Sequence, residues 1–401
     1  MNGCSAYRTL VLVALTALLW LVVTAKLPPW LEVDSDTGKR PPMSVVADAA
    51  VAPPDDYIWI DRERLQRLPL DGPAWQNLRD AARDPLMPPD LSDQDDPANV
   101  QVLAKALVHA RTGDASLRET VVMACMLAIG TERSGRTLSL GKELIAYVLA
   151  ADLVDLSGDK DTRFRAWLRE LLGRPFPSGK TLRSTHEVRP NNWGTYAGAS
   201  RLAAVAYLGD REELARAARV FKGWLGDRDS YAGFDFKDRG WQADPESPVG
   251  INPAGSRKRG FSIDGVLPDD QRRGGDFKWP PPRENYVYSA LQGAVAQAVI
   301  LSRAGYPVWE WEDRALLRAF RWLHEQAEYP AVGDDTWQPH GVNDYYGTDF
   351  PAPVPAEPGK NVGWTDWTHG PAARRLKAGR GGEYERSPPA ADGTRETVPH
   401  N

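Results

Sequence analysis

Two asparagines precede a run of small residues at positions 189–201 (RPNNWGTYAGASR). Pro190 interrupts the chain before them, so Asn191 and Asn192 are expected at the first turn of a helix. The free N–H groups and the positive dipole end of a helix start favour a carboxylate ligand. The same residues also suit a plain N-cap and close helix packing. This segment alone therefore leaves ligand binding and packing equally open.

A second segment concentrates positive charge in an otherwise acidic chain. Residues 264–275 (DGVLPDDQRRGG) are followed by 284–291 (ENYVYSAL), which opens a long apolar stretch. Between positions 257 and 283, the basic residues outnumber the acidic ones: Arg257, Lys258, Arg259, Arg272, Arg273, Lys278 and Arg283 against Asp264, Asp269, Asp270 and Asp276. Such a patch can attract a polyanion and bind its carboxylates in bidentate fashion, although a solvated surface loop has the same composition.

The order of these motifs resembles the alginate lyases, polysaccharide lyases that fold as an α/α toroid. The shared pattern is Asn-Asn with an aromatic residue, then Asp-Gly-x-Leu-Pro, an Arg nine residues after that Asp, and a Tyr opening an Ala/Leu-rich helix. It extends over about residues 191–304. Two departures stand out. Trp193 occupies the position of the family's His, and the spacing between Arg273 and Tyr286 is longer than in the family.

The resemblance implies roles for individual residues. Asn192 would neutralise the uronate carboxylate, Arg273 would support it, and Tyr286 would exchange protons with the sugar. Because the family's His is missing, His186 is a candidate second proton carrier, with His340 as another. Further residues are predicted to bind substrate: Asn191, Trp193, Tyr196, Arg272, Tyr288, Trp337 and His340. For both histidines a structural role is the favoured alternative, and Tyr288 and Tyr196 are weaker alternatives to Tyr286.

The implied reaction is β-elimination on an acidic polysaccharide such as alginate, polymannuronate or glucuronan. Removal of the C5 proton requires neutralisation of the adjacent carboxylate, which Asn192 and Arg273 would supply. Tyr286 would act as base and then protonate the departing O4, with Arg273 or Arg272 favouring its phenolate form. Two other functions stay open: a glycoside hydrolase using Asp264 with Asp334 or Asp335, and a non-catalytic protein that binds acidic polysaccharide.

Apolar residues recur at helical spacing through most of the chain, and strand-like alternation is scarce. The runs are 100–110, 117–129, 138–153, 164–172, 197–208, 212–225, 286–304 and 311–327. Gly-Asp pairs at 113–114, 158–159 and 209–210 are suited to end one helix and cap the next. The expected fold is all-α, an incomplete α/α toroid of helical hairpins. Long loops at 230–284 and 329–370 would form the cleft.

The two ends of the chain differ from this body. Arg8 precedes an apolar stretch at 9–25 that ends in Val-Thr-Ala, so residues 1–25 are predicted to be a signal peptide or a signal anchor. Residues 26–55 are predicted to be a flexible linker, 56–370 the catalytic toroid, and 371–401 a disordered tail. The body is thus expected to be secreted, periplasmic or on the cell surface, with a membrane tether through residues 9–25 as one option.

The amino-acid composition argues against several classes of ligand and partner. The 401 residues carry a formal charge of -5, which argues against a nucleic-acid-binding protein. The two cysteines, Cys4 and Cys125, predict no disulfide, and the six scattered histidines show no metal-binding spacing. No cofactor is indicated, and a monomer is expected. The 15 tryptophans suit sugar platforms, although most Trp side chains in proteins belong to the core.

Overall fold

The computed structural model describes residues 56–237 and 239–376, and in these ranges the chain is almost entirely helix and loop. In chain order the elements are α2 (Arg62–Arg67), α3 (Gly72–Arg83), α4 (Ala98–Thr112), α5 (Ala115–Ala128), η2 (Thr131–Ser134), α6 (Thr137–Leu153), α7 (Gly158–Gly173), α8 (Leu182–Val188), α9 (Asn192–Leu208), α10 (Arg211–Leu225), β1 (Arg257–Lys258), β2 (Phe261–Ser262), α11 (Pro268–Gln271), η3 (Arg272–Gly274), α12 (Asn285–Arg303), η4 (Val308–Glu310), α13 (Trp311–Arg321), η5 (Trp322–Gln326), η6 (Gly333–Asp335), α14 (Gln338–Tyr346) and α15 (Thr365–Thr368). The predicted all-α class is confirmed. Closure of the helices into a toroid stays a prediction.

Glycine and aspartate separate several helices as the sequence predicts. Gly113 ends α4 with a left-handed φ of 77°, and the Asp114 carboxylate then accepts hydrogen bonds from two backbone N–H groups of α5. Gly209 likewise ends α9 with a left-handed φ, and the Asp210 carboxylate accepts a hydrogen bond from the Glu213 backbone N–H of α10. The pair at 158–159 is different, because both residues lie inside α7.

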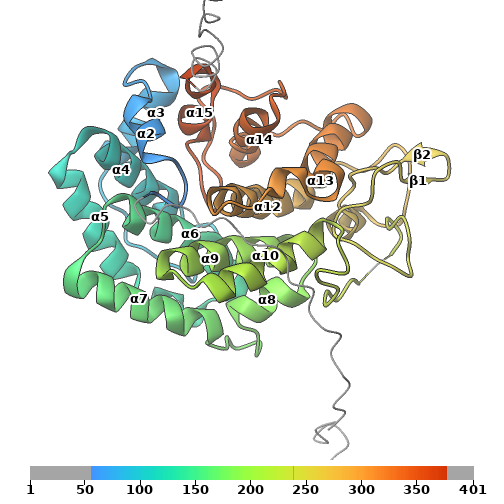
Figure 1. Ribbon diagram of the computed structural model, residues 1–401, viewed down its shortest axis with the longest axis horizontal. Helices are drawn as coiled ribbons and strands as arrows, with labels where there is room; N and C mark the ends of the chain where they lie inside the picture. Colours follow the sequence, from blue (N-terminus) through green and yellow to red (C-terminus); the bar gives the residue numbers. More distant parts are fainter. Residues whose placement is uncertain (1–55, 238, 377–401) are drawn as a thin grey trace, which may run out of the picture. The chain divides into compact units, whose positions relative to one another are not determined.

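Helix α9 is the centre of the packing around the site. It packs most extensively on α6 and α12, and Figure 1 shows these helices near the middle of the helical body. Small residues make the contacts close: a Cβ at Gly141 of α6 would lie 2.9 Å from the Ala197 backbone nitrogen, and one at Gly293 of α12 would lie 2.3 Å from the Thr195 carbonyl carbon. Glycine at these two positions allows the backbones of three helices to meet.

The two long loop regions are ordered within the described residues. The first contains the only strands of that part of the chain, where β1 pairs with β2 in antiparallel fashion, followed by α11 and η3. The second contains η6, α14 and α15. Each region thus supplies short elements rather than featureless chain, as needed to hold functional side chains in place.

Part of the predicted C-terminal tail is described by the structure, whereas the predicted N-terminal segments are not. Residues 371–376 are helical, Ala373 is buried, and Arg374 donates a hydrogen bond to the Thr348 carbonyl, so the expectation of disorder from residue 371 is wrong for these positions. The predicted signal and linker at 1–55 lie outside the described residues. None of the helices within residues 56–237 and 239–376 has the length and apolarity needed to span a bilayer.

Candidate active site

A cavity of about 430 Å³ lies beside the start of α9 and the start of α12. It brings together five of the residues predicted from sequence to form the site: Asn192, Trp193, Tyr196, Arg273 and Tyr286. Eleven further residues complete its lining: Gln94, Asp95, Arg136, Leu138, Lys142, Asn285, Ser289, Gln292, Asp334, Asp335 and Lys360. Residues far apart in the sequence thus share one polar cavity.

The start of α9 is fixed by two hydrogen bonds. The Asn191 side chain is the N-cap and accepts from the Trp193 backbone N–H. The Asn192 backbone N–H donates to the Asp270 carboxylate at 3.1 Å, which joins α9 to α11. Burial raises the pKa of Asp270, with the adjacent charge of Asp269 as a further cause. The Asn-Asn and Asp-Asp-Gln-Arg-Arg segments are therefore bonded to each other directly.

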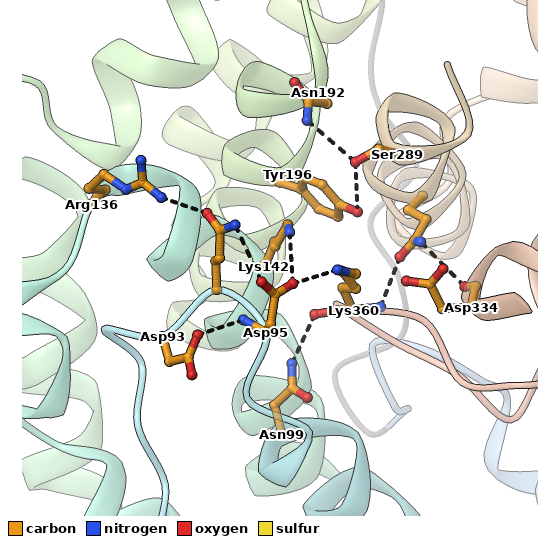
Figure 2. Close-up of polar contacts among 12 residues, drawn as sticks. Asp93, Asp95, Asn99, Arg136, Lys142, Asn192, Tyr196, Ser289, Asp334 and Lys360 are labelled. Atoms are coloured by element: carbon orange, nitrogen blue, oxygen red, sulfur yellow. Dashed lines mark hydrogen bonds and ion pairs between the residues drawn. The ribbon is translucent and has the colours of Figure 1, made fainter. Parts of the chain in front are cut away.

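The Asn192 amide faces the cavity and is only partly used by the protein. Its nitrogen donates to the Ser289 hydroxyl at 3.3 Å, as Figure 2 shows. An amide nitrogen carries two N–H groups, so one donor is left for a ligand. The Asn192 Oδ1 atom is buried without a hydrogen-bond partner among the described residues. Such a group is suited to receive a polar ligand, because an unmade buried hydrogen bond is costly.

Arg273 and Tyr286 are in direct contact. The guanidinium carbon of Arg273 lies 4.7 Å from the centroid of the Tyr286 ring. Tyr286 stands at the second position of α12, lines the cavity and is 39% exposed. A guanidinium over the ring face stabilises negative charge on the aromatic group. Arg273 and Tyr286 thus line the cavity as a contacting pair.

Tyr196 is the other tyrosine of the cavity, and its environment is the opposite. It is fully buried, and its hydroxyl accepts a hydrogen bond from Ser289 at 3.3 Å. Burial raises the pKa of Tyr196 well above its usual value, which keeps the phenol protonated. The two tyrosines thus differ in exposure, because Tyr286 is exposed whereas Tyr196 is a buried part of the cavity wall.

Two lysines meet at one aspartate on the opposite side of the cavity. Asp95 accepts a hydrogen bond from Lys360 at 2.5 Å, and the Lys142 ammonium lies 3.8 Å from the same oxygen (Figure 2). Lys142 comes from the buried helix α6 and also lies 5.5 Å from the centroid of the Tyr196 ring. Burial, together with the charge of Lys360, lowers the pKa of Lys142. A bound carboxylate would compensate that desolvation.

Two acids close the cavity near η6. Asp335 accepts hydrogen bonds on one oxygen from Gln292 (2.8 Å) and Gln338 (2.9 Å). Burial raises the pKa of Asp335 to about 7, and the charge of Asp334 contributes. The Asp334 carboxylate has no hydrogen-bond or ion-pair partner within the described ranges. The cavity thus carries both signs of charge, with Arg136, Lys142, Arg273 and Lys360 as its cations.

His186, predicted as a second proton carrier, does not line this cavity. Its ring is buried in α8, where Nδ1 lies 3.3 Å from the Arg201 guanidinium. Burial lowers the pKa of His186 well below its usual value, and the charge of Arg201 adds to this effect. Closeness in sequence to Asn192 was misleading, because Pro190 separates α8 from α9. His186 belongs to a structural cluster with Arg201.

Other residues predicted to bind substrate also lie outside the lining. Tyr288 is buried and donates to the Tyr329 carbonyl. His340 is buried beside the Pro353 carbonyl, and Trp337 is fully buried in the core. These three assignments are corrected to structural positions.

Two polar residues predicted to bind substrate, Arg272 and Asn191, instead stabilise the elements next to the cavity. Arg272 bonds back to Asp269, the acid three residues earlier, at 3.0 Å, whereas Arg273 faces Tyr286. Asn191 is the N-cap of α9. Neither lines the cavity, so the predicted direct contact with substrate is not what the structure shows for them.

The carboxylate pair of the hydrolase hypothesis is also separated. Asp264 does not line the cavity, and its carboxylate forms an ion pair with Arg318 at 2.7 Å. Asp334 and Asp335 do line it. A larger hollow of about 560 Å³, bordered by residues 321–330 and 348–351, contains none of the predicted site residues.

Sequence reasoning missed the cationic side of the cavity. Lys142 lies within the apolar run 138–153, which predicted a helix and no site residue. The adjacent charges of Lys142 and Glu143 inside this largely apolar helix were the available signal, because buried charged groups need partners. Asp95 and Lys360 lie in irregular segments with no periodicity, so nothing in the sequence pairs them.

Comparison with known families agrees with the resemblance. Residues 130–229 match the family model of the alginate lyases. The predicted similarity to alginate lyases is thereby confirmed over this part of the chain, which contains Lys142, Asn192, Trp193 and Tyr196 and supports a polysaccharide lyase. The other two residues of the implied alginate lyase site, Arg273 and Tyr286, lie beyond the match. No curated protein matches the chain.

Proposed function

We propose that this protein cleaves a uronate-containing acidic polysaccharide by β-elimination in the cavity of Asn192, Arg273 and Tyr286. The observation that carries the proposal is the convergence of an amide donor, a cation and an exposed tyrosine at one cavity. Elimination at a uronate needs those three functions: neutralisation of the carboxylate, support of the developing charge, and a proton carrier.

The bonding changes assign each residue a part. Tyr286 as phenolate takes the C5 proton, and the electrons of the C5–H bond form the C4=C5 double bond. The C4–O4 bond breaks, and the departing O4 takes the proton from the Tyr286 phenol. The negative charge that develops on the uronate carboxyl group is stabilised by the free N–H of Asn192.

Lys142 would take the part of the histidine that the alginate lyases have at the position of Trp193. Its side chain lines the same cavity from α6, which packs against α9, and its ammonium lies 5.5 Å from the centroid of the Tyr196 ring. The Trp193 ring instead has two guanidinium groups near it, Arg136 at 5.6 Å and Arg189 at 5.7 Å. Trp193 would thus position Arg136 at the cavity while Lys142 carries the electrostatic work.

Product analysis tests the proposal. The purified protein should be incubated with polymannuronate, alginate, glucuronan and alternating uronate copolymers, and the products followed by ultraviolet absorbance and mass spectrometry. A lyase gives a 4,5-unsaturated uronate at the new non-reducing end. Saturated ends with incorporation of ¹⁸O from labelled water would instead show hydrolysis.

A glycoside hydrolase is the second candidate, because Asp335 has its pKa raised to about 7 by burial and so can hold a proton near neutral pH. Its oxygen is, however, occupied by two glutamine amides, whereas Tyr286 is open to the cavity. The lyase therefore fits the lining better. We also propose that the protein is exported through residues 1–25; N-terminal sequencing of protein recovered from the extracytoplasmic fraction tests this.

A further inference from the structure

A second, smaller pocket of about 170 Å³ adjoins the cavity and has a different charge. The two share four lining residues: Gln94, Asp95, Asp334 and Lys360. Asp96 and Glu143 add two more acids to the small pocket, and Lys360, its one cationic lining residue, is already bonded to Asp95. We call this pocket the acidic sub-pocket.

Glu143 shows that the acidic sub-pocket is more than a cluster of surface carboxylates. The residue is only 1% exposed, and neither of its carboxyl oxygens has a hydrogen-bond partner among the described residues. Burial raises the pKa of Glu143 well above its usual value, and the charge of Asp96 adds to this. A buried carboxyl without a partner is costly, so a ligand that supplies a donor would be stabilised here.

Asp334 provides the second unpartnered acid, at the boundary between the cavity and the acidic sub-pocket. No cation within the described residues forms an ion pair with it. A homopolymer of uronates places a carboxylate on every sugar, and a carboxylate beside Asp334 and Asp96 would be repelled. The lining therefore suits a neighbouring sugar that carries hydrogen-bond donors and positive charge.

We propose that the substrate alternates a uronate with an amino sugar, whose free ammonium group binds in the acidic sub-pocket between Asp334 and Glu143. This refinement rests on the proposed elimination for the uronate half. The cavity of Asn192, Lys142 and Arg273 receives the uronate carboxylate, and the acidic sub-pocket receives the next sugar. Opposite charges in adjacent sites then fix the register of the chain before cleavage.

Calorimetric binding to oligosaccharides of equal length tests the charge preference without relying on catalysis. The probes are an alternating glucuronate–glucosamine oligomer with free amines, its N-acetylated form, and a glucuronate homo-oligomer. The wild-type protein should bind the free-amine oligomer at least about five times more tightly than the N-acetylated form, because a half-exposed ion pair between the ammonium group and Asp334 contributes about that much. Equal or tighter binding of the homo-oligomer would overturn the proposal.

Variants assign the effect to the sub-pocket. Asp334→Asn keeps the shape of the side chain and should bring the ratio of the free-amine to the N-acetyl affinity close to one. Asp159→Asn, at an exposed acid of α7, is the matched control and should leave that ratio unchanged. Glu143→Gln should also lower the ratio, with circular dichroism checking the fold. An unchanged ratio in Asp334→Asn would contradict the assignment.

Elimination assays on the same oligomers separate this proposal from the general one. Unsaturated products from homo-oligomers and free-amine oligomers at equal rates would preserve the lyase and refute the amino-sugar site. A free-amine preference in binding without any unsaturated product would support the sub-pocket and refute the lyase.

Discussion

Replacing Tyr286 by phenylalanine tests the chemistry with little disturbance to the fold. The side chain is 39% exposed, and its hydroxyl has no hydrogen-bond partner among the described residues. Phenylalanine keeps the ring over which the Arg273 guanidinium lies, and that cation–π contact is worth about 0.5–1 kcal/mol at an exposed site. The free energy of unfolding of Tyr286→Phe should therefore stay within about 0.5 kcal/mol of wild type.

The effect on turnover should be much larger. Loss of a proton-transfer group lowers the rate about 10²- to 10⁴-fold, which corresponds to roughly 3–5 kcal/mol in the activation barrier. Urea unfolding, calorimetric binding of a uronate oligomer and the initial rate of unsaturated product formation measure the three quantities separately. We expect wild-type stability, near wild-type binding and nearly complete loss of elimination.

Tyr196→Phe is the informative comparison, because both tyrosines line the same cavity. The buried Tyr196 hydroxyl accepts from Ser289, so its removal should cost about 1 kcal/mol of stability. If Tyr286→Phe retains close to wild-type product formation while Tyr196→Phe is inactive, the proton carrier has been assigned to the wrong tyrosine. If both variants stay active, the proposed mechanism is wrong.

Three further substitutions test the frame around the site. Lys142→Met should lower kcat/KM on a uronate substrate about 10- to 100-fold, because a charged contact with the substrate is lost. Lys142→Arg keeps the positive charge and should recover part of this loss. An unchanged kcat/KM in Lys142→Met would refute the proposed role of Lys142. Asp335→Asn should flatten the pH dependence of stability. In the wild type, the Asp335 carboxyl group holds its proton to a higher pH in the folded state than in the unfolded state. The free energy of unfolding should therefore fall by up to a few kcal/mol as pH rises from about 4 to about 7. If the wild type and Asp335→Asn show the same pH dependence in urea unfolding, the raised pKa of Asp335 is contradicted. Gly293→Ala should cost about 1–3 kcal/mol of stability and reduce activity, because its Cβ would lie 2.3 Å from the Thr195 carbonyl carbon. Gly341→Ala is the control, because its nearest contact would be at 3.7 Å, and it should leave thermal unfolding nearly unchanged. Equal melting temperatures of the two variants would refute the close packing at Gly293.

The helices were predictable because each buries a stripe of apolar residues that recurs at helical spacing. The same signal explains the residues that were missed. Helix α6 is buried on nearly all sides, so Lys142 was hidden in a run that matched the pattern of a core helix. The short helices α8 and α14 carry too few apolar residues to show a period. His186 was a candidate because it is close to Asn192 in sequence, and His340 because it lies in the predicted loop 329–370.

The site residues carried over from the alginate lyase motifs were predicted more successfully than the two histidines. Asn192, Arg273 and Tyr286 were identified by resemblance, and the structure brings them to one cavity. The resemblance assigned Arg273 to the site but left open which of Arg272 and Arg273 faces Tyr286, because the direction of each side chain depends on η3. There Arg272 turns back to Asp269, and Arg273 faces Tyr286.

The close contacts of α9 bear on the proposal that Lys142 takes the part of the alginate lyases' histidine. Gly141 and Gly293 let α6 and α12 approach the backbone of α9 from different helices, so side chains of all three reach the cavity. A positive charge needed beside Asn192 can then come from α6 instead of α9 itself. Lys142 is held by the most buried of these three helices. In the proposed mechanism, Lys142 would therefore supply the positive charge from α6 while Trp193 stands on α9.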